Sequence, residues 1–219
     1  MILAIADVLS EADIEAVRAG MASATFVDGK ATAGWAARLV KDNLQASGGP
    51  EVERLRALIE KRLLAHPVFA LAARPKAFIG PLFSRYQPGH AYGTHVDDAL
   101  IAGMRTDVSF TLFLSPEDAY EGGELVIETT AGEEAFKLAP GSLVAYPATT
   151  LHRVAPVMRG ERLAAAGWVR SFVRDAGRRE LLFDLETARR RLFDREGKTA
   201  EADLLAKCAA NLVRMWCED

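Results

Sequence analysis

The chain has 219 residues, of which 50% are hydrophobic and 26% are charged, and its formal net charge at pH 7 is -3. The length favours one compact domain with appended helices over two independent domains, and the composition is typical of a globular protein with a sizeable core. No block of like charge indicates a nucleic-acid partner, and no apolar run reaches the roughly 18 residues needed to cross a membrane. The first residues lack the basic segment of a signal peptide, so we expect a cytoplasmic protein.

Residues 1–77 are predicted to form a helical support region. Ser10 and Asp13 match a capping box, in which each side chain bonds to the backbone N–H of the other residue at the start of a helix. A second helix is predicted to begin at Pro50, since proline suits the first helical position, and to end at Pro67.

Residues 78–175 change to the two-residue period of β-strands. Apolar residues at 108, 110, 112 and 114 alternate with a mostly polar set, and four further short β-type runs follow, at 124–129, 142–146, 152–157 and 163–173. Turn signals such as Gly122-Gly123 and Pro140-Gly141 separate these runs. Many short strands with regular turns predict a mainly β fold, a double-sheet jelly roll or barrel, with flanking helices.

Residues 176–219 return to a helical period and are predicted to form a C-terminal helical extension. Gly197 is a plausible stop for one helix, and Thr199 suits the cap of the next. The extension is expected either to cover a sheet or to form a homodimer contact, and the sequence does not choose between these. Its two cysteines, Cys208 and Cys217, lie roughly 13 Å apart along one helix, too far for a disulfide, so we expect reduced thiols.

A candidate metal site follows from three residues of the β region. His95 and Asp97 are two positions apart, so in an extended chain both side chains lie on the same face and can approach one metal ion. A third ligand must come from elsewhere, and His152 is the best candidate because it begins another predicted strand. Two imidazoles and one carboxylate leave three positions open on an octahedral ion, which suits Fe(II) that binds a chelating co-substrate and O₂ together.

Arg162 makes this combination more specific, because a lone His-x-Asp motif is weak support for a metal site. It comes ten residues after His152, and a β-hairpin between the two would return the arginine to the metal. Its guanidinium can then pair bidentately with the far carboxylate of a metal-chelating oxo-acid. Taken alone, Arg162 would be read as an exposed turn residue.

The sequence also resembles a known family. The stretches that carry the resemblance are RYQPGHAYGTHVD, RTDVSFTLFLSPEDAYEGGELVIE, LAPGSLVAYPATTLHRVAPVMRGER and RSFVRDAGRRELLFDLETARRRL. They are similar to the 2-oxoglutarate- and Fe(II)-dependent prolyl/lysyl hydroxylase-like oxygenases, most closely the bacterial PKHD-type hydroxylases, over nearly the whole length. The resemblance implies a double-stranded β-helix core, iron ligands at His95, Asp97 and His152, and a 2-oxoglutarate anchor at Arg162.

The resemblance also bears on the aromatic residues around the site. It implies that Tyr86 lines the co-substrate pocket, whereas Tyr92 has no assigned role beyond a possible contact with substrate. The second co-substrate tyrosine of animal prolyl hydroxylases aligns with Phe113, which has no hydroxyl, so Ser109 or Thr111 is a candidate to supply that hydrogen bond.

The predicted function is an Fe(II)- and 2-oxoglutarate-dependent dioxygenase that hydroxylates a substrate and releases succinate and CO₂. The resemblance implies that L-ascorbate supports activity, and the substrate is either a small molecule or a peptidyl side chain. Two other functions stay open. The same triad could hold Zn²⁺ in a hydrolase, although Arg162 and the lack of another nearby general base count against it. A degenerate β-fold could act as a 2-oxo-acid or metal sensor, although the intact triad counts against that.

Overall fold

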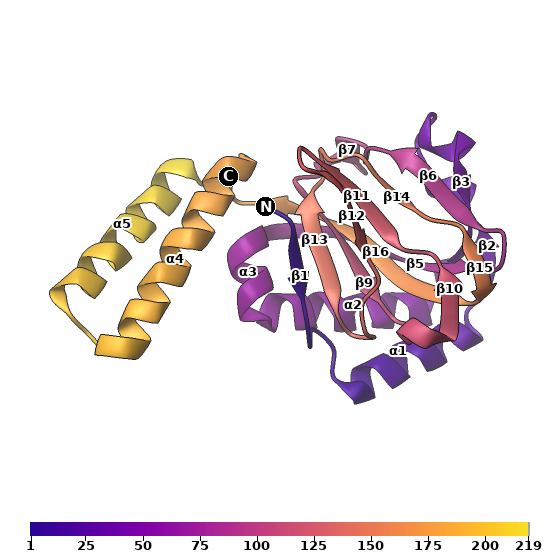
Figure 1. Ribbon diagram of the computed structural model, residues 1–219, viewed down its shortest axis with the longest axis horizontal. Helices are drawn as coiled ribbons and strands as arrows, with labels where there is room; N and C mark the ends of the chain where they lie inside the picture. Colours follow the sequence, from indigo (N-terminus) through magenta and orange to yellow (C-terminus); the bar gives the residue numbers. More distant parts are fainter. Residues whose placement is uncertain (219) are drawn as a thin grey trace.

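Two antiparallel sheets form the body of the protein in the computed structural model, which describes residues 1–218 (Figure 1). The larger sheet has seven strands in the order β1-β13-β9-β16-β5-β4-β2, and the smaller has five in the order β12-β11-β14-β6-β3. Sequence neighbours are rarely sheet neighbours, as expected of the predicted jelly roll.

The strands of the larger sheet are β1 (Leu3–Ile5), β2 (Phe26–Asp28), β4 (Leu44–Ala46), β5 (Pro75–Tyr86), β9 (Val108–Phe113), β13 (Leu143–Pro147) and β16 (Arg162–Ser171). Those of the smaller sheet are β3 (Lys41–Asp42), β6 (Ala91–His95), β11 (Leu125–Thr129), β12 (Gly132–Phe136) and β14 (His152–Val154). Two further pairs are β7 (Leu100–Ile101) with β8 (Met104–Arg105), and β10 (Tyr120–Gly122) with β15 (Val157–Gly160). The α-helices are α1 (Glu11–Ser23), α2 (Pro50–Ala65), α3 (Pro67–Ala73), α4 (Ala176–Glu196) and α5 (Ala200–Trp216).

The strand β9 shows how the larger sheet divides its two faces. Val108, Phe110 and Leu112 belong to the main hydrophobic core, which includes apolar side chains of α1, α2 and α3. The alternating residues Ser109 and Thr111 are also buried, and they line a cavity on the other face of the sheet. The polar half of this alternating strand therefore faces a site inside the protein rather than solvent.

The N-terminal region contains the predicted helices but is helical only in part. The Ser10–Asp13 capping box is present at α1, and Pro50 stands at the start of α2, as predicted. The segment 26–46, however, contributes β2, β3 and β4. These strands are only two or three residues long, so a helix-sized window does not detect their period; each is stabilised by pairing with another strand.

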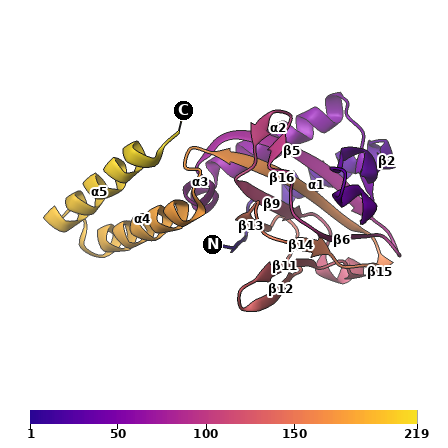
Figure 2. The ribbon, with the colours of Figure 1, turned by 90° about the horizontal axis from the view of Figure 1, so that it is seen from above.

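The helices α4 and α5 form an arm that extends away from the sheets (Figures 1 and 2). Its helix boundaries agree with the sequence, because Gly197 ends α4 and the Thr199 side chain caps α5. Within residues 1–218 the arm contacts the body at its base, where α4 packs on α3 and Glu218, after α5, bonds to Phe172, so the length of the arm does not cover a sheet. The homodimer contact stays a prediction. Both cysteines are free thiols, and Asp219, the last residue of the predicted extension, lies outside the described residues.

Among residues 1–218, no helix combines the length and the apolar character needed to span a lipid bilayer.

Candidate functional site

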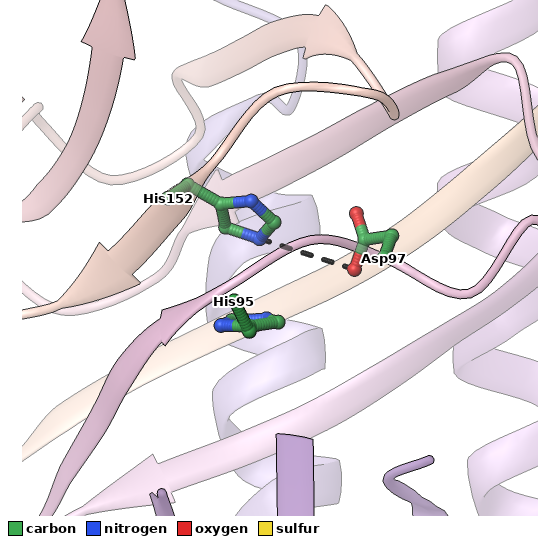
Figure 3. A group of neighbouring side chains, drawn as sticks. All are labelled: His95, Asp97 and His152. Atoms are coloured by element: carbon green, nitrogen blue, oxygen red, sulfur yellow. Dashed lines mark ion pairs between the residues drawn. The ribbon is translucent and has the colours of Figure 1, made fainter. Parts of the chain in front are cut away.

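The structure brings His95, Asp97 and His152 together (Figure 3). His95 ends β6 and His152 begins β14, and the two residues are direct partners across these neighbouring strands. Asp97 lies two residues beyond the end of β6, and its Oδ1 is 3.9 Å from Nε2 of His152. One ligand atom from each residue lies within 4.8 Å of the others, a spacing that a single metal ion can bridge.

Backbone carbonyls fix the orientation of both imidazoles. Nδ1 of His95 is 2.9 Å from the carbonyl oxygen of Gly93, and Nδ1 of His152 is 3.0 Å from that of Thr150. When Nδ1–H donates to these carbonyls, the lone pair of each ring is on Nε2, which is free to bind a metal. Burial, assisted by the neighbouring His152, lowers the pKa of His95 to about 4, so this imidazole is neutral at pH 7.

The carboxylate of Asp97 is held from the opposite sheet. The Ser109 hydroxyl, on β9, donates a hydrogen bond of 2.5 Å to Oδ2 of Asp97, which leaves Oδ1 on the side of His152. Ser109 was one of two candidates to contact the co-substrate, and in this structure its hydroxyl is bonded to Asp97. Asp98, the next residue, is exposed.

Two tyrosines pack on the histidine rings. The ring of Tyr92 stacks on His95 with centroids 3.7 Å apart, and Tyr146 meets His152 edge-on at 4.9 Å. Strand alternation would put Tyr92 and His95 on opposite faces. A register irregularity allows the contact, because β6 advances three residues from Tyr92 to His95 while β14 advances two, from Val154 to His152. Tyr146 was not singled out from the sequence.

Arg162 and Tyr86 form a second part of the same site. They are direct partners across β16 and β5, and Arg162 is only 1% exposed. The guanidinium carbon lies 5.1 Å from the centre of the Tyr86 ring and 5.6 Å from that of Phe113. Burial raises the pKa of Tyr86, so its hydroxyl keeps its proton and can donate a hydrogen bond.

The position of Arg162 is supported on both sides. The Ser115 side chain donates to the carbonyl of Glu161 and accepts from the N–H of Leu163, so it holds the residues before and after the arginine. Gly123 has a φ of +69°, and a Cβ at that position would lie 3.0 Å from Cδ of Arg162. Glycine therefore satisfies the left-handed backbone and leaves room for the arginine stem.

A cavity of about 440 Å³ joins the two parts. The triad, Arg162, Tyr86, Ser109 and Tyr146 all line it, together with small residues of the segment 29–40. Because side chains of both sheets reach this cavity, the space between the sheets is the candidate active site.

The residues of the cavity fit a metal ion and a carboxylate. Two imidazoles and a carboxylate are a donor set that holds Fe(II) while leaving further coordination positions for ligands. Nε and Nη2 of Arg162 are buried and have no hydrogen-bond partner among residues 1–218. These two nitrogens share one edge of the guanidinium and match both oxygens of a single carboxylate. The guanidinium lies over the Tyr86 and Phe113 rings and near the Tyr120 hydroxyl, but a buried edge without full hydrogen bonds is costly, so a bound anion is the natural occupant of this position.

The sequence and the architecture are similar to those of known proteins. The sequence pattern of the 2OG-Fe(II) oxygenase superfamily matches residues 81–170. A PKHD-type hydroxylase from Acaryochloris marina and another from Picosynechococcus are each 51% identical to this chain over 219 residues, with 100% of both chains covered.

Solved structures share the fold at lower identity. A prolyl-4-hydroxylase from Pseudomonas putida is 21% identical, covers 78% of this chain and 92% of its own, and superimposes with a TM-score of 0.57. A viral collagen prolyl hydroxylase from Paramecium bursaria Chlorella virus-1, in its 2OG complex, is 20% identical, covers 78% and 96%, and gives a TM-score of 0.54.

A jelly roll that surrounds a cluster of two histidines and one aspartate is the architecture of an iron-dependent oxygenase. With full-length relatives at 51% identity, the chain belongs to the 2OG-Fe(II) oxygenase superfamily and, within it, to the PKHD-type hydroxylases. The jelly-roll fold and this family were both predicted from the sequence, and both are confirmed.

Proposed function

We propose that the protein hydroxylates its substrate in a reaction that depends on Fe(II) and consumes 2-oxoglutarate. His95, Asp97 and His152 are the iron ligands in this proposal. Arg162 binds the distal carboxylate of 2-oxoglutarate, and Tyr86 lines the same end of the cavity. The observation that carries the proposal is the buried, partnerless edge of Arg162 in the cavity that also contains the triad.

The protein contributes mainly geometry and the exclusion of water. When bound, iron supplies the activation of O₂ that couples decarboxylation of 2-oxoglutarate to hydroxylation of a C–H bond. The carbonyls of Gly93 and Thr150 keep both imidazoles in the ligating tautomer, and Ser109 keeps Asp97 pointed toward them. The rings of Tyr92 and Tyr146 shield the histidines from solvent.

The remaining parts of the proposal concern the reductant, the substrate class and the cellular compartment. L-ascorbate is proposed to support activity by restoring iron that has oxidised without turnover. The substrate is proposed to be a small molecule or a peptidyl side chain, and the protein is proposed to act in the cytoplasm.

The test begins with protein purified without oxygen and freed of metal. Fe(II) and 2-oxoglutarate are added, and the visible metal-to-ligand charge-transfer band is recorded for wild type, Asp97→Ala and Arg162→Ala. Asp118→Ala and Arg159→Ala are matched controls, because both side chains are exposed and lie outside the cavity.

We expect a band in the wild type and both controls, and none in Asp97→Ala. Arg162→Ala should need at least about a hundredfold more 2-oxoglutarate, since a buried bidentate ion pair is lost. Tight zinc binding without any band would instead favour the zinc hydrolase or the sensor. Conversion of 2-oxoglutarate to succinate in the presence of Fe(II) would separate the oxygenase from both.

A further inference from the structure

A stripe of polar side chains lines the cavity beside the two parts of the site already described, because β3 pairs with β6 and β4 pairs with β5. Lys41, Asn43 and Gln45 occupy alternate positions of the extended segment that forms β3 and β4, and all three are buried and line the cavity. The intervening Asp42 is exposed. This alternation turns one polar face of the segment inward.

Lys41 is the charged member of the stripe and is only 4% exposed. Its Nζ donates a hydrogen bond of 3.0 Å to the Thr32 hydroxyl and lies 5.0 Å from the centre of the Tyr92 ring. Within residues 1–218 no carboxylate forms an ion pair with it, although Asp97 and Asp28 attract it from a greater distance. An ammonium group in this position is desolvated but not neutralised, which is costly unless a ligand compensates.

Asn43 gives a second, independent sign that this wall binds a ligand. It is 3% exposed, and its amide oxygen and nitrogen are buried without a full hydrogen bond among the described residues, although the Tyr86 hydroxyl lies close enough for the amide to act on its pKa. Buried amides are normally paired, so an unpaired one in a cavity wall indicates a bound polar group.

The two cations of the cavity lie at different depths. Arg162 is at the closed end, where it is almost fully buried. The Lys41 ammonium is bonded to Thr32, which is itself exposed, so this cation is nearer to the mouth. A single 2-oxoglutarate, with one carboxylate at the iron and the other at Arg162, would therefore leave Lys41 without a partner.

The charges of the cavity interior support a second anion. With Fe(II), Arg162 and Lys41 counted against Asp97 and the two carboxylates of 2-oxoglutarate, one positive charge is left over. Asp98 also lines the cavity, but it is exposed and solvent screens its charge.

We propose that Lys41 is a specificity-determining residue that binds a carboxylate of the substrate to be hydroxylated. This inference rests on the proposed function, because it assigns the other cation, Arg162, to 2-oxoglutarate. The substrate class is then a carboxylate-bearing molecule, and the apolar side chains at the mouth, Val96, Leu100 and Ile101, suit an aliphatic body next to that carboxylate.

The test uses wild-type protein loaded with Fe(II) and saturating 2-oxoglutarate in the absence of oxygen. Three pairs of probes, each a carboxylate and its neutral amide, are titrated by calorimetry: acetate and acetamide, isovalerate and isovaleramide, and N-acetyl-L-leucine and N-acetyl-L-leucinamide. Lys41→Gln, Lys41→Arg and the exposed-lysine control Lys30→Gln are measured in the same way.

We expect the wild type and Lys30→Gln to bind at least one carboxylate about tenfold more tightly than its amide, since a charge-assisted hydrogen bond is involved. Lys41→Gln should lose this preference and Lys41→Arg should keep it, while the 2-oxoglutarate affinity of both stays within about twofold of wild type. The charge-transfer band, recorded for each variant, verifies that the site has formed.

Three results would overturn the inference: no carboxylate preferred by the wild type, a preference that survives Lys41→Gln, or a loss of 2-oxoglutarate affinity in Lys41→Gln like that of Arg162→Ala. The wild-type comparison needs no variant, so it decides the question even if Lys41→Gln does not fold. Absence of the charge-transfer band in the wild type would contradict the proposed function itself, a different result from a normal band without carboxylate preference.

Discussion

The hydroxyl of Ser109 donates a hydrogen bond of 2.5 Å to Asp97 across the space between the two sheets. The bond joins a strand of the larger sheet to a proposed metal ligand that follows a strand of the smaller one. A carboxylate that protrudes beyond the end of its strand thus gains a fixed direction from the facing sheet.

Ser109→Ala should therefore weaken Fe(II) binding by about tenfold or more, as is usual when the partner of a metal ligand is removed. The reason is that Asp97 would remain available but would no longer be oriented. Competitive titration against a coloured chelator measures the affinity, with Ser23→Ala at the exposed end of α1 as control. An unchanged iron affinity would show that the strand ends alone position Asp97.

Arg162→Lys should bind 2-oxoglutarate at least about tenfold more weakly than the wild type. Lysine keeps the charge but presents a single ammonium in place of the paired N–H groups of the guanidinium edge. Titration of the charge-transfer band gives the affinity for 2-oxoglutarate. Arg162→Gln lacks both the charge and the paired N–H groups, so it should bind 2-oxoglutarate more weakly still. Equal affinities of Arg162→Lys and wild type would mean that charge alone anchors the co-substrate.

Lys41→Met should stabilise the metal-free protein at neutral pH. Burial lowers the pKa of Lys41 to about 8 from an ordinary value of 10.5, even though Asp97 and Asp28 attract its charge. Between pH 8 and pH 10.5 Lys41 is protonated more fully in the unfolded chain than in the folded one. The free energy of unfolding of the wild type therefore rises with pH across this range. Below pH 8 the full cost of the buried charge is present, on the order of 3 kcal/mol.

Urea unfolding of wild type and Lys41→Met at pH 7, 9 and 10 tests this dependence. The variant should be the more stable at pH 7, and its advantage should shrink toward pH 10, because the wild-type lysine is neutral there. Groups common to both proteins cancel in the difference. A constant difference across the series would contradict the assigned pKa.

The homodimer predicted from the sequence can be tested on the arm. Leu204 is 57% exposed and Met215 is 72% exposed on α5, and the arm touches the body only at its base. We predict a dimer in which these side chains are covered, so Leu204→Glu should yield a monomer by light scattering while the charge-transfer band is retained. A monomeric wild type would contradict the prediction.

Much of the candidate site could be predicted because its residues are close in sequence or repeat with a strand period. His95 and Asp97 are two positions apart, and their convergence follows from the pleat. His152 was chosen because it begins a predicted strand, and it does begin β14. Arg162 was placed by a β-hairpin with His152, and that hairpin was wrong, because β14 belongs to the smaller sheet and β16 to the larger one. Both residues still line the cavity, because the two sheets face each other across it. The capping box of α1 and the cap of α5 are local patterns, so they too were predicted correctly.

The residues that were missed depend on long-range pairing. Lys41 faces the cavity only because β3 pairs with β6 and β4 pairs with β5, and strands of two or three residues have too little period to be recognised. The alternation of Lys41, Asn43 and Gln45 was a visible signal, but it fell within a region assigned to helices. The stacking of Tyr92 on His95 depends on a register irregularity, which no period in the sequence encodes.

The α4–α5 arm returns the chain to the place where it left the body. The N–H of Glu218 donates to the carbonyl of Phe172 at 2.8 Å, and the Glu218 carboxylate pairs with Arg105 at 2.9 Å. Arg105 in turn pairs with Asp107, whose carboxylate accepts from the N–H of Ser171 at the end of β16. The arm is thus held to the body at both of its ends. We therefore expect its amide protons to exchange cooperatively with those of the sheet edge, rather than by fraying from the chain terminus.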